Sequence, residues 1–293
     1  LIAWRISQGR AFFSFSLVIL SLYALVVLLQ SLSLAILVFA ISATLAIFVV
    51  QGAIHPSVRG SQRYLLVTLL SVPLLLTAVW LVDQSLAAPE NAALASQALL
   101  PTLLGFGLLL AVFPFGTWMP ALAADAPPIA TAFIFTVSQA MTLYLLLLFL
   151  RNSPWMLEET ALPTFIQLAG LLMAASGGIM AAVQQDFGRL FGYAALSDLG
   201  YLLLASVVGG SQGEILTLLY VTNRAVSVTL MAAGLAILRQ RAATDQFAGL
   251  QGVARKLPVA TLGVMIGGLA LAGFPLTAGF PIHWSVSRAV WSW

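Results

Sequence analysis

The sequence predicts an all-α polytopic membrane protein, and three observations lead to that prediction. Of its 293 residues, 61% are hydrophobic and only 7% are charged, whereas a soluble domain carries roughly 25% charged residues. The mean hydropathy is +1.05. Apolar runs of about 20 residues, the length that crosses a bilayer as a helix, recur along the chain. Helices are expected because lipid offers the backbone no hydrogen-bond partner.

Nine spans follow from these runs, and a tenth begins near residue 279. Polar or turn-forming stretches such as HPSVRGSQR and RNSPWMLEET separate them. The nine spans are residues 12–30, 34–54, 64–82, 97–113, 129–150, 162–183, 190–208, 215–237 and 258–274. We expect one transmembrane domain over residues 1–293. Because the chain lacks an initiator Met and stops within an apolar stretch, we expect it to be part of a longer protein.

The loops between these spans differ in charge on the two sides of the membrane. With the N-terminus inside, the inner side collects Arg5, Arg10, Arg59, Arg63, Arg189, Arg239, Arg241, Arg255 and Lys256. The outer loops collect Arg151 and the acidic Asp83, Glu90, Glu158, Glu159 and Glu214. Since Lys and Arg concentrate on the cytoplasmic side, the N-terminus is predicted to be cytoplasmic, and the alternation supports the number of spans.

The composition also excludes several kinds of site. The chain has no cysteine, so it has no disulfide, thiolate metal site or cysteine-bound iron–sulfur cluster of its own. Its two histidines, His55 and His283, are too few and too separated for a haem or metal site. No basic cluster interleaved with aromatic residues indicates nucleic acid, and no glycine-rich dinucleotide turn is present. We expect no cofactor, no metal and no catalytic site in this chain.

Two opposite charges at membrane depth are the main candidates for function. Asp198 lies in span 190–208, and Arg224 lies in the next, antiparallel span. Both are about 15 Å from the shared loop at 209–214, at 1.5 Å rise per residue. Ionisable groups at this depth usually face the interior and pair, so we predict an interhelical ion pair. The pair fits a proton or ion relay, but it also fits a static salt bridge that fixes the register of two helices.

Weaker candidates lie around this pair. Gln139, next to Ser138, places an amide in the fifth span. Residues 113–134, with four prolines, and residues 271–284, with Pro and Gly, indicate two broken helices, whose freed carbonyls can line a polar cavity. A re-entrant turn or a plain loop would explain the same pattern at 113–134. His283 follows the second break and is either an ordinary buried polar residue or a proton carrier.

Four segments, in this order, resemble motifs of one family. They are PFGTWMPALAADAPPIATAFI, GGIMAAVQQDFGRLFGYAALSDLGYLLLA, LTLLYVTNRAVSVTLMAAGLAIL and GLQGVARKLPVATLGVMIGGLALAGFPLTAGF. They are similar to PFHxWLPDAHxxAPTxxSxLL, GxxxALxQxDIKRLLAYSSISHMGYxLL, YLLxHALxKALLFLxAGxxI and GGLxRKMPxxAxxFxIGxLSLAGxPPxxGF of the antiporter-like membrane subunits. That family includes subunits of respiratory complex I, Mrp-type cation/proton antiporters and membrane-bound hydrogenases. The resemblance runs from about residue 100 to 284.

The resemblance implies inverted repeats of five helices, each with one broken helix, and a line of buried lysines, glutamates and histidines at the membrane midplane. It implies partners too: the lipid bilayer and other membrane subunits of a hetero-oligomeric complex. It places the protein in an energy-transducing membrane, such as a bacterial inner membrane. Redox chemistry, where the complex has any, as in an NADH-quinone oxidoreductase, belongs to other subunits.

Most of the family's relay residues are absent from this chain. The buried glutamate falls near Ile41, and two buried lysines fall near Leu109 and Ala140. The DIKR lysine is Gly188, although Asp186 and Arg189 remain. Asp198 aligns with the motif histidine of SISHMG, while Arg224 and Val228 align with the histidine and lysine of HALxK. The candidate proton or ion pathway residues are Asp198, Arg224, Gln139, His283, Asp186 and Arg189.

Three functions fit this pattern. The first is a divergent subunit of a complex-I-like or Mrp-like assembly that moves protons or sodium through Asp198, water and its partners. The second is a non-conducting scaffold subunit of a membrane complex. The third is an independent transporter of a small solute, which would use the two broken helices.

Overall fold

The apolar runs form helices that stand side by side. The computed structural model describes residues 12–51, 59–87, 92–158, 162–208, 210–242, 244 and 246–291, and within these ranges the chain is helical apart from turns and one isolated bridge between Asp186 and Gln246. The helices are α2 (Phe12–Leu28), α3 (Leu32–Val50), α4 (Arg59–Ala87), α5 (Ala92–Leu109), α6 (Trp118–Asp125), α7 (Pro128–Phe133), α8 (Gln139–Asn152), α9 (Trp155–Glu158), α10 (Leu162–Ala182), α11 (Phe187–Val207), α12 (Gly210–Ala242), α13 (Val253–Lys256), α14 (Pro258–Leu271) and α15 (Gly279–Trp291). Shorter turns are η1 (Phe115–Thr117), the π-helical η2 (Ile134–Ser138) and η3 (Phe247–Leu250).

The predicted fold class is confirmed, and each of the nine predicted spans coincides with an apolar helix. Six helical segments in the described ranges are long and apolar enough to cross a membrane, and three more are apolar but shorter. The long ones are Leu32–Val50, Arg59–Ala87, Pro128–Asn152, Leu162–Ala182, Phe187–Val207 and Gly213–Ala242. The shorter ones are Phe12–Leu28, Ser96–Leu109 and Pro258–Leu271. The predicted tenth element near 279 is the 13-residue α15.

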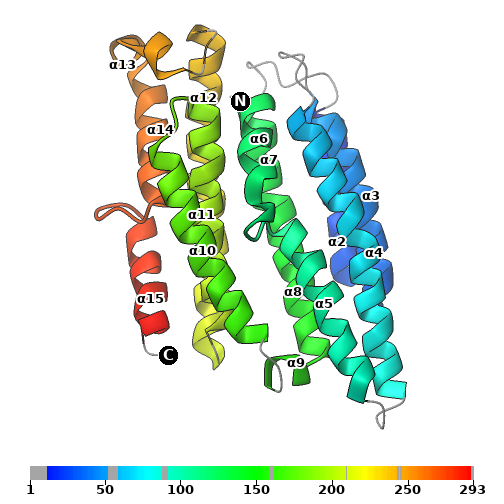
Figure 1. Ribbon diagram of the computed structural model, residues 1–293. Helices are drawn as coiled ribbons and strands as arrows, with labels where there is room; N and C mark the ends of the chain where they lie inside the picture. Colours follow the sequence, from blue (N-terminus) through cyan, green and yellow to red (C-terminus); the bar gives the residue numbers. More distant parts are fainter. Residues whose placement is uncertain are drawn as a thin grey trace.

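The helices form two groups joined by a short pair (Figure 1). In one group α2 packs on α3, α3 on α4, and α4 on α5. In the other, α11 lies between α10 and α12, and α12 also contacts α14 and α15. Helices α6 and α7 join the groups, because α6 packs on both α4 and α11 while α7 packs on α12.

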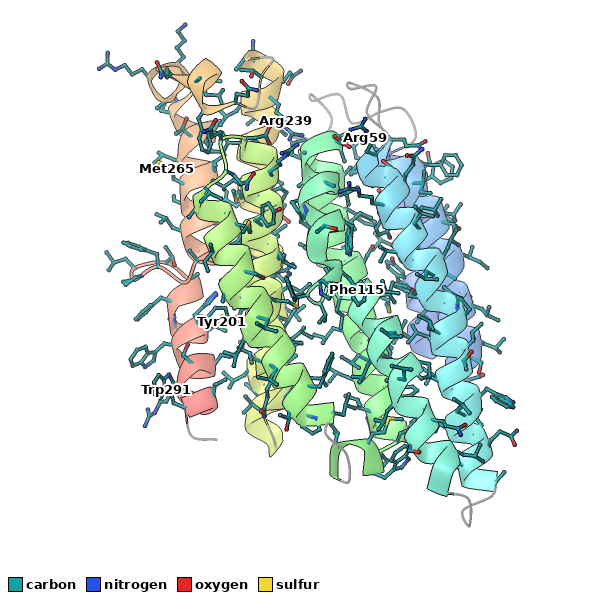
Figure 2. The ribbon with its side chains drawn as sticks, in the orientation of Figure 1. Arg59, Phe115, Tyr201, Arg239, Met265 and Trp291 are labelled. Carbon is teal, nitrogen blue, oxygen red and sulfur yellow. The ribbon has the colours of Figure 1, made fainter. Side chains whose placement is uncertain are left out.

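Both predicted helix breaks are present. The first begins where α5 ends at Leu109 and continues through η1 into α6; Figure 2 places Phe115 of this break near mid-height. Ala126 and Pro127 then separate α6 from α7. The second break lies between α14 and α15, which follow one another along the same side of the bundle (Figure 1). Proline and glycine signals therefore located both breaks.

The freed carbonyls at the end of α6 are bound by a cation from α12. Arg239 donates through Nη1 to Ala126 O at 2.8 Å and through Nη2 to Ala123 O at 2.9 Å. A cation at a helix C-terminus also interacts favourably with the helix dipole. This contact ties the first break to the second group of helices.

The predicted alternation of charge matches the geometry. Arg59 and Arg239, both assigned to the inner side, lie at the same end of the bundle, whereas Trp291 lies toward the other end (Figure 2). The basic α13 is at the Arg239 end, and α9 with Glu158 is at the opposite end (Figure 1). Five residues of the prediction, Arg5, Arg10, His55, Glu90 and Glu159, lie outside the described residues.

Candidate functional site

The predicted ion pair between Asp198 and Arg224 is confirmed. Asp198 lies on α11 with a relative exposure of 0%, and Arg224 lies on α12 with 2%. Nη1 of Arg224 donates to Oδ2 of Asp198. Of the charged side chains in the described ranges, these two are the buried ones. Because removing water from two charges is costly, such a pair persists when further hydrogen bonds satisfy both groups.

Close packing of α10 on α11 fixes the direction in which Asp198 points. A side chain at Gly177 of α10 would lie 2.6 Å from the backbone nitrogen of Ser197, so only a glycine allows this approach. The hydroxyl of Ser197 donates to Ala174 O at 2.8 Å. Since Ser197 faces α10, its neighbour Asp198 faces the interior and α12. Gly177 of α10 therefore acts through helix packing.

Arg224 reaches two backbone carbonyls besides the carboxylate. Its Nη1 donates to Ala195 O on α11 at 3.0 Å, and its Nε donates to Phe135 O at 3.3 Å. Phe135 belongs to the π-helical turn η2, and such turns are frequent at functional sites. The Nη2 of Arg224 has no hydrogen-bond partner in the described part of the chain. The guanidinium thus links α11, α12 and η2.

His283 and Tyr220 complete the charged site. The hydroxyl of Tyr220, on α12, lies 2.8 Å from Oδ1 of Asp198 and 2.8 Å from Nε2 of His283 on α15. The Nδ1 of His283 lies 2.9 Å from Gly279 O, and its Nε2 lies 3.8 Å from Oδ1 of Asp198. Tyr220 has 0% exposure and His283 has 7%. We call Asp198, Tyr220, Arg224 and His283 the charged site.

Gln139 belongs to a second, neutral site in the first group of helices. Its Nε2 donates at 3.1 Å to the carbonyl of Leu109, which the end of α5 leaves free. The adjacent Ser138 accepts a hydrogen bond from Tyr23 at 2.9 Å. A small cavity beside them is lined by Tyr64 and by the hydroxyl-bearing Thr68 and Thr142, among others. We call Tyr23, Ser138 and Gln139, with the Leu109 carbonyl, the neutral site.

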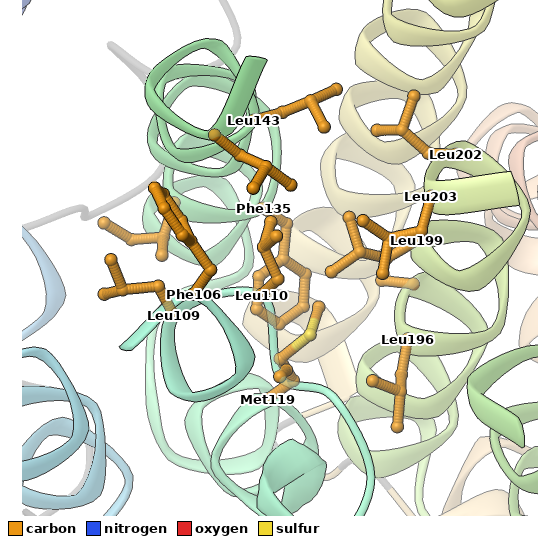
Figure 3. Close-up of a cluster of buried hydrophobic side chains, with 14 of the residues drawn as sticks. Phe106, Leu109, Leu110, Met119, Phe135, Leu143, Leu196, Leu199, Leu202 and Leu203 are labelled. Atoms are coloured by element: carbon orange, nitrogen blue, oxygen red, sulfur yellow. The ribbon is translucent and has the colours of Figure 1, made fainter. Parts of the chain in front are cut away.

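Apolar side chains pack between the two groups of helices (Figure 3). They come from α5 and the turn that follows it, and from α6, η2, α8 and α11, and they point toward one another: Phe106, Leu109, Leu110, Met119, Phe135, Leu143, Leu196, Leu199, Leu202 and Leu203. Leu109 belongs to the helix end that Gln139 binds, and Leu199 follows Asp198. Among the described residues, no side-chain hydrogen bond runs from the neutral site to the charged site.

Asp186 and Arg189 lie away from both sites. Asp186 is the N-cap residue of α11, and its Oδ1 accepts a hydrogen bond from the backbone nitrogen of Arg189 at 2.9 Å. An N-cap of this kind typically contributes about 1 kcal/mol to helix stability. Asp198 follows Asp186 by twelve positions along α11, a rise of about 18 Å. Asp186 and Arg189 therefore lie at the start of α11, and their assignment to an ion pathway stays a prediction.

Tyr220 was not predicted from the sequence. A tyrosine in an apolar helix is usually a packing residue, but Tyr220 lies one helical turn before Arg224 and so shares its face. That spacing was the available signal. In the parts of the chain that the structure describes, no three His, Asp or Glu side chains gather as metal ligands.

The family model described as "NADH:quinone oxidoreductase/Mrp antiporter, TM" matches residues 11–293, nearly the whole chain. The chain belongs to this family. Membership extends the resemblance seen at residues 100–284 to the N-terminal helices, where the sequence motifs were weak.

Individual members of the antiporter-like family differ considerably from this chain. The NADH-quinone oxidoreductase subunit N of Chromohalobacter salexigens is 32% identical over 183 residues, which cover 61% of this chain and 38% of that protein. The chain thus spans less than half the length of this curated relative.

Two solved structures share the fold. A chain of the archaeal membrane-bound sulfane sulfur reductase superposes with a TM-score of 0.75 at 20% identity, covering 87% of this chain and 55% of the other. A chain of respiratory complex I from Thermus thermophilus gives 0.67 at 22% identity, covering 88% and 59%. At these identities the likeness establishes the architecture alone.

Proposed function

We propose that this chain is a membrane subunit of an ion-translocating assembly of the complex I or Mrp type, and that protons, or sodium ions, move through its charged site. One observation supports this most strongly. Asp198, Tyr220 and His283 form a buried, hydrogen-bonded series of ionisable groups in the fold of the antiporter-like family. Intramembrane ionisable residues generally mark ion pathways because burying them for packing alone is costly.

The partners and placement belong to the same proposal. The subunit sits in a hetero-oligomeric complex of an energy-transducing membrane, such as a bacterial inner membrane, with its N-terminus on the cytoplasmic side. Support for the partners comes from the relatives and structures, which carry the names of complex subunits. Support for the orientation comes from the Arg-rich end that holds Arg59, Arg239 and α13.

A scaffold without conduction is the second candidate, and the apolar packing of Figure 3 favours it. Leucine and phenylalanine side chains cannot carry a proton, and they fill the region where α5, η2 and α11 meet. In that case the Asp198–Arg224 pair would fix the register of α11 against α12, and ions would be translocated by other subunits of the assembly.

Replacing Asp198 separates these candidates. The full-length protein, in its assembly and native membrane, is tested as Asp198→Asn, with proton movement followed in vesicles by a pH-sensitive dye. Asp83→Asn is the matched control, because Asp83 is exposed on α4 and lies outside the charged site. We expect at least a tenfold loss of proton movement in Asp198→Asn and none in the control, with the assembly intact on a native gel.

Two other results would reject conduction through this site. If Asp198→Asn moves protons as fast as the control, the scaffold function is favoured. The same holds if activity falls only in proportion to the amount of assembled complex, because Asp198 then acts through stability.

A further inference from the structure

We propose that Tyr220 bridges a shared proton between His283 and Asp198, and that these three residues together hold one proton more than an ionised aspartate and a neutral histidine would. The proton count follows from the hydrogen-bond geometry alone. The use of that proton in transport rests on the proposed function.

One end of the series fixes the position of a first proton. Nδ1 of His283 is 2.9 Å from the carbonyl oxygen of Gly279, which lies one turn earlier on α15. A carbonyl only accepts hydrogen bonds, so Nδ1 must carry the hydrogen. In a neutral imidazole the other nitrogen, Nε2, is then an acceptor.

The middle of the series needs a second proton. The Tyr220 oxygen lies 2.8 Å from Nε2 of His283 and 2.8 Å from Oδ1 of Asp198, so both contacts have hydrogen-bond length. An ionised aspartate and a neutral Nε2 are both acceptors, and a hydroxyl has one hydrogen to donate. One contact would therefore place two lone pairs against each other. Buried polar groups are normally satisfied, so a further proton must lie on Nε2 or on Oδ1.

Two arrangements satisfy every contact. In the first, His283 is an imidazolium, its Nε2–H donates to Tyr220, and Tyr220 donates to the Asp198 carboxylate. In the second, Asp198 is protonated on Oδ1 and donates to Tyr220, which donates to neutral His283. The first becomes the second when the Nε2 proton passes to the tyrosine oxygen and the tyrosine proton passes to Oδ1. The Nε2–H bond and the original tyrosine O–H bond break, a new tyrosine O–H bond and an Oδ1–H bond form, and the total charge does not change.

The groups around His283, Tyr220 and Asp198 restrict proton exchange to these three residues. Arg224 donates to the other carboxylate oxygen, Oδ2, and a guanidinium keeps its protons in proteins. The Tyr201 ring of α11 packs against the His283 ring in a tilted arrangement, with 4.7 Å between centroids. No hydrogen bond of its hydroxyl is found within the described residues. Arg224 is thus a fixed positive charge, and the mobile proton is confined to His283, Tyr220 and Asp198.

Nuclear magnetic resonance can count the proton directly. Residues 1–293 hold two histidines, so a His55→Gln variant of the full-length protein in lipid bilayers removes the other one, and the signals lost in His283→Gln identify those of His283. Nitrogen-15 shifts report whether each ring nitrogen is protonated, and carbon-13 shifts report whether the Asp198 carboxyl is. At neutral pH we expect either a doubly protonated His283 or a protonated Asp198. A neutral His283 together with an ionised Asp198 would overturn the proposal.

Two phenylalanine variants test whether Tyr220 is the bridge. Tyr220→Phe keeps the ring and removes the hydroxyl, so the extra proton should be lost, leaving neutral His283 beside ionised Asp198. Tyr201→Phe removes a hydroxyl next to the same histidine and should leave the spectrum unchanged. If Tyr220→Phe keeps the extra proton, the bridge is wrong.

The same variants distinguish a failure of this inference from a failure of the proposed function. Conduction through the bridge predicts at least a tenfold loss of proton movement in Tyr220→Phe and none in Tyr201→Phe. A shared proton in the spectrum without any effect of Asp198→Asn on transport would reject the function and keep the inference. Transport that depends on Asp198 but not on Tyr220, with no shared proton in the spectrum, would reject the inference and keep the function.

Discussion

The neutral site and the charged site solve the same physical problem with different groups. Each meets the carbonyls of an interrupted helix: Gln139 binds Leu109 O at the end of α5, and Arg224 binds Phe135 O in the π-helical turn. In the neutral site the partners are an amide and hydroxyls, whereas in the charged site they include a carboxylate, a guanidinium and an imidazole. The comparison teaches that the fold tolerates polar groups at depth in both groups of helices, but only the charged site contains a carboxylate and an imidazole joined through a hydroxyl.

The largest difference between the sites should appear in stability. Arg224→Met leaves Asp198 buried without its cation, and we expect a loss of about 3 to 5 kcal/mol in the free energy of unfolding. Adding Asp198→Leu removes the uncompensated charge and should restore most of the lost stability. Unfolding of the purified protein in detergent measures the four corners of this double-mutant cycle. Additive losses would show that the two charges do not interact.

A smaller loss is expected at Gln139. Gln139→Leu takes away the donor for Leu109 O but also removes its own Oε1, which lacks a partner among the described residues. We therefore expect about 1 kcal/mol, near the lower end of the cost of an unmet buried carbonyl. The same unfolding assay checks it. A loss as large as that of Arg224→Met would erase the distinction between the sites.

The smallest effect is expected at Tyr23. Tyr23→Phe deletes one hydrogen bond, to Ser138, and bonds between membrane helices average roughly 0.6 kcal/mol. Tyr193→Phe, on α11, is the control. Neither change should slow proton movement in the assembly. A clear slowing in Tyr23→Phe alone would mean that the neutral site, too, takes part in translocation.

Hydropathy and breaking residues made most of the fold predictable. Every apolar run became a helix because lipid leaves the backbone no other choice, and the prolines of 113–134 and the Pro and Gly of 271–284 located the breaks. The exact helix ends were less predictable. Helix α12, for example, continues to Ala242 beyond the apolar run, since its polar last turn includes Arg239, which binds α6.

The charged site was predictable only in part. Depth along two consecutive spans was enough to pair Asp198 with Arg224. His283 could not be placed, because its approach depends on how α15 is oriented after a break whose angle the sequence does not specify. The carbonyl of Phe135 could not be anticipated either, since a π-helical turn has no clear sequence signal and depends on neighbouring contacts. The use of Arg239 to bind α6 was likewise a tertiary contact without a local pattern.

The position of Arg239 has an evolutionary consequence at Gly188, where the resembling motif has a lysine. Any side chain at Gly188 would place its Cβ 2.8 Å from the carbonyl oxygen of Ala123 and would also meet the guanidinium of Arg239. The obstacle includes backbone, so a rotamer change alone cannot remove it. A Gly188→Lys substitution would therefore be unfavourable unless α6 and Arg239 change first, which is an obstacle to acquiring a lysine at this position.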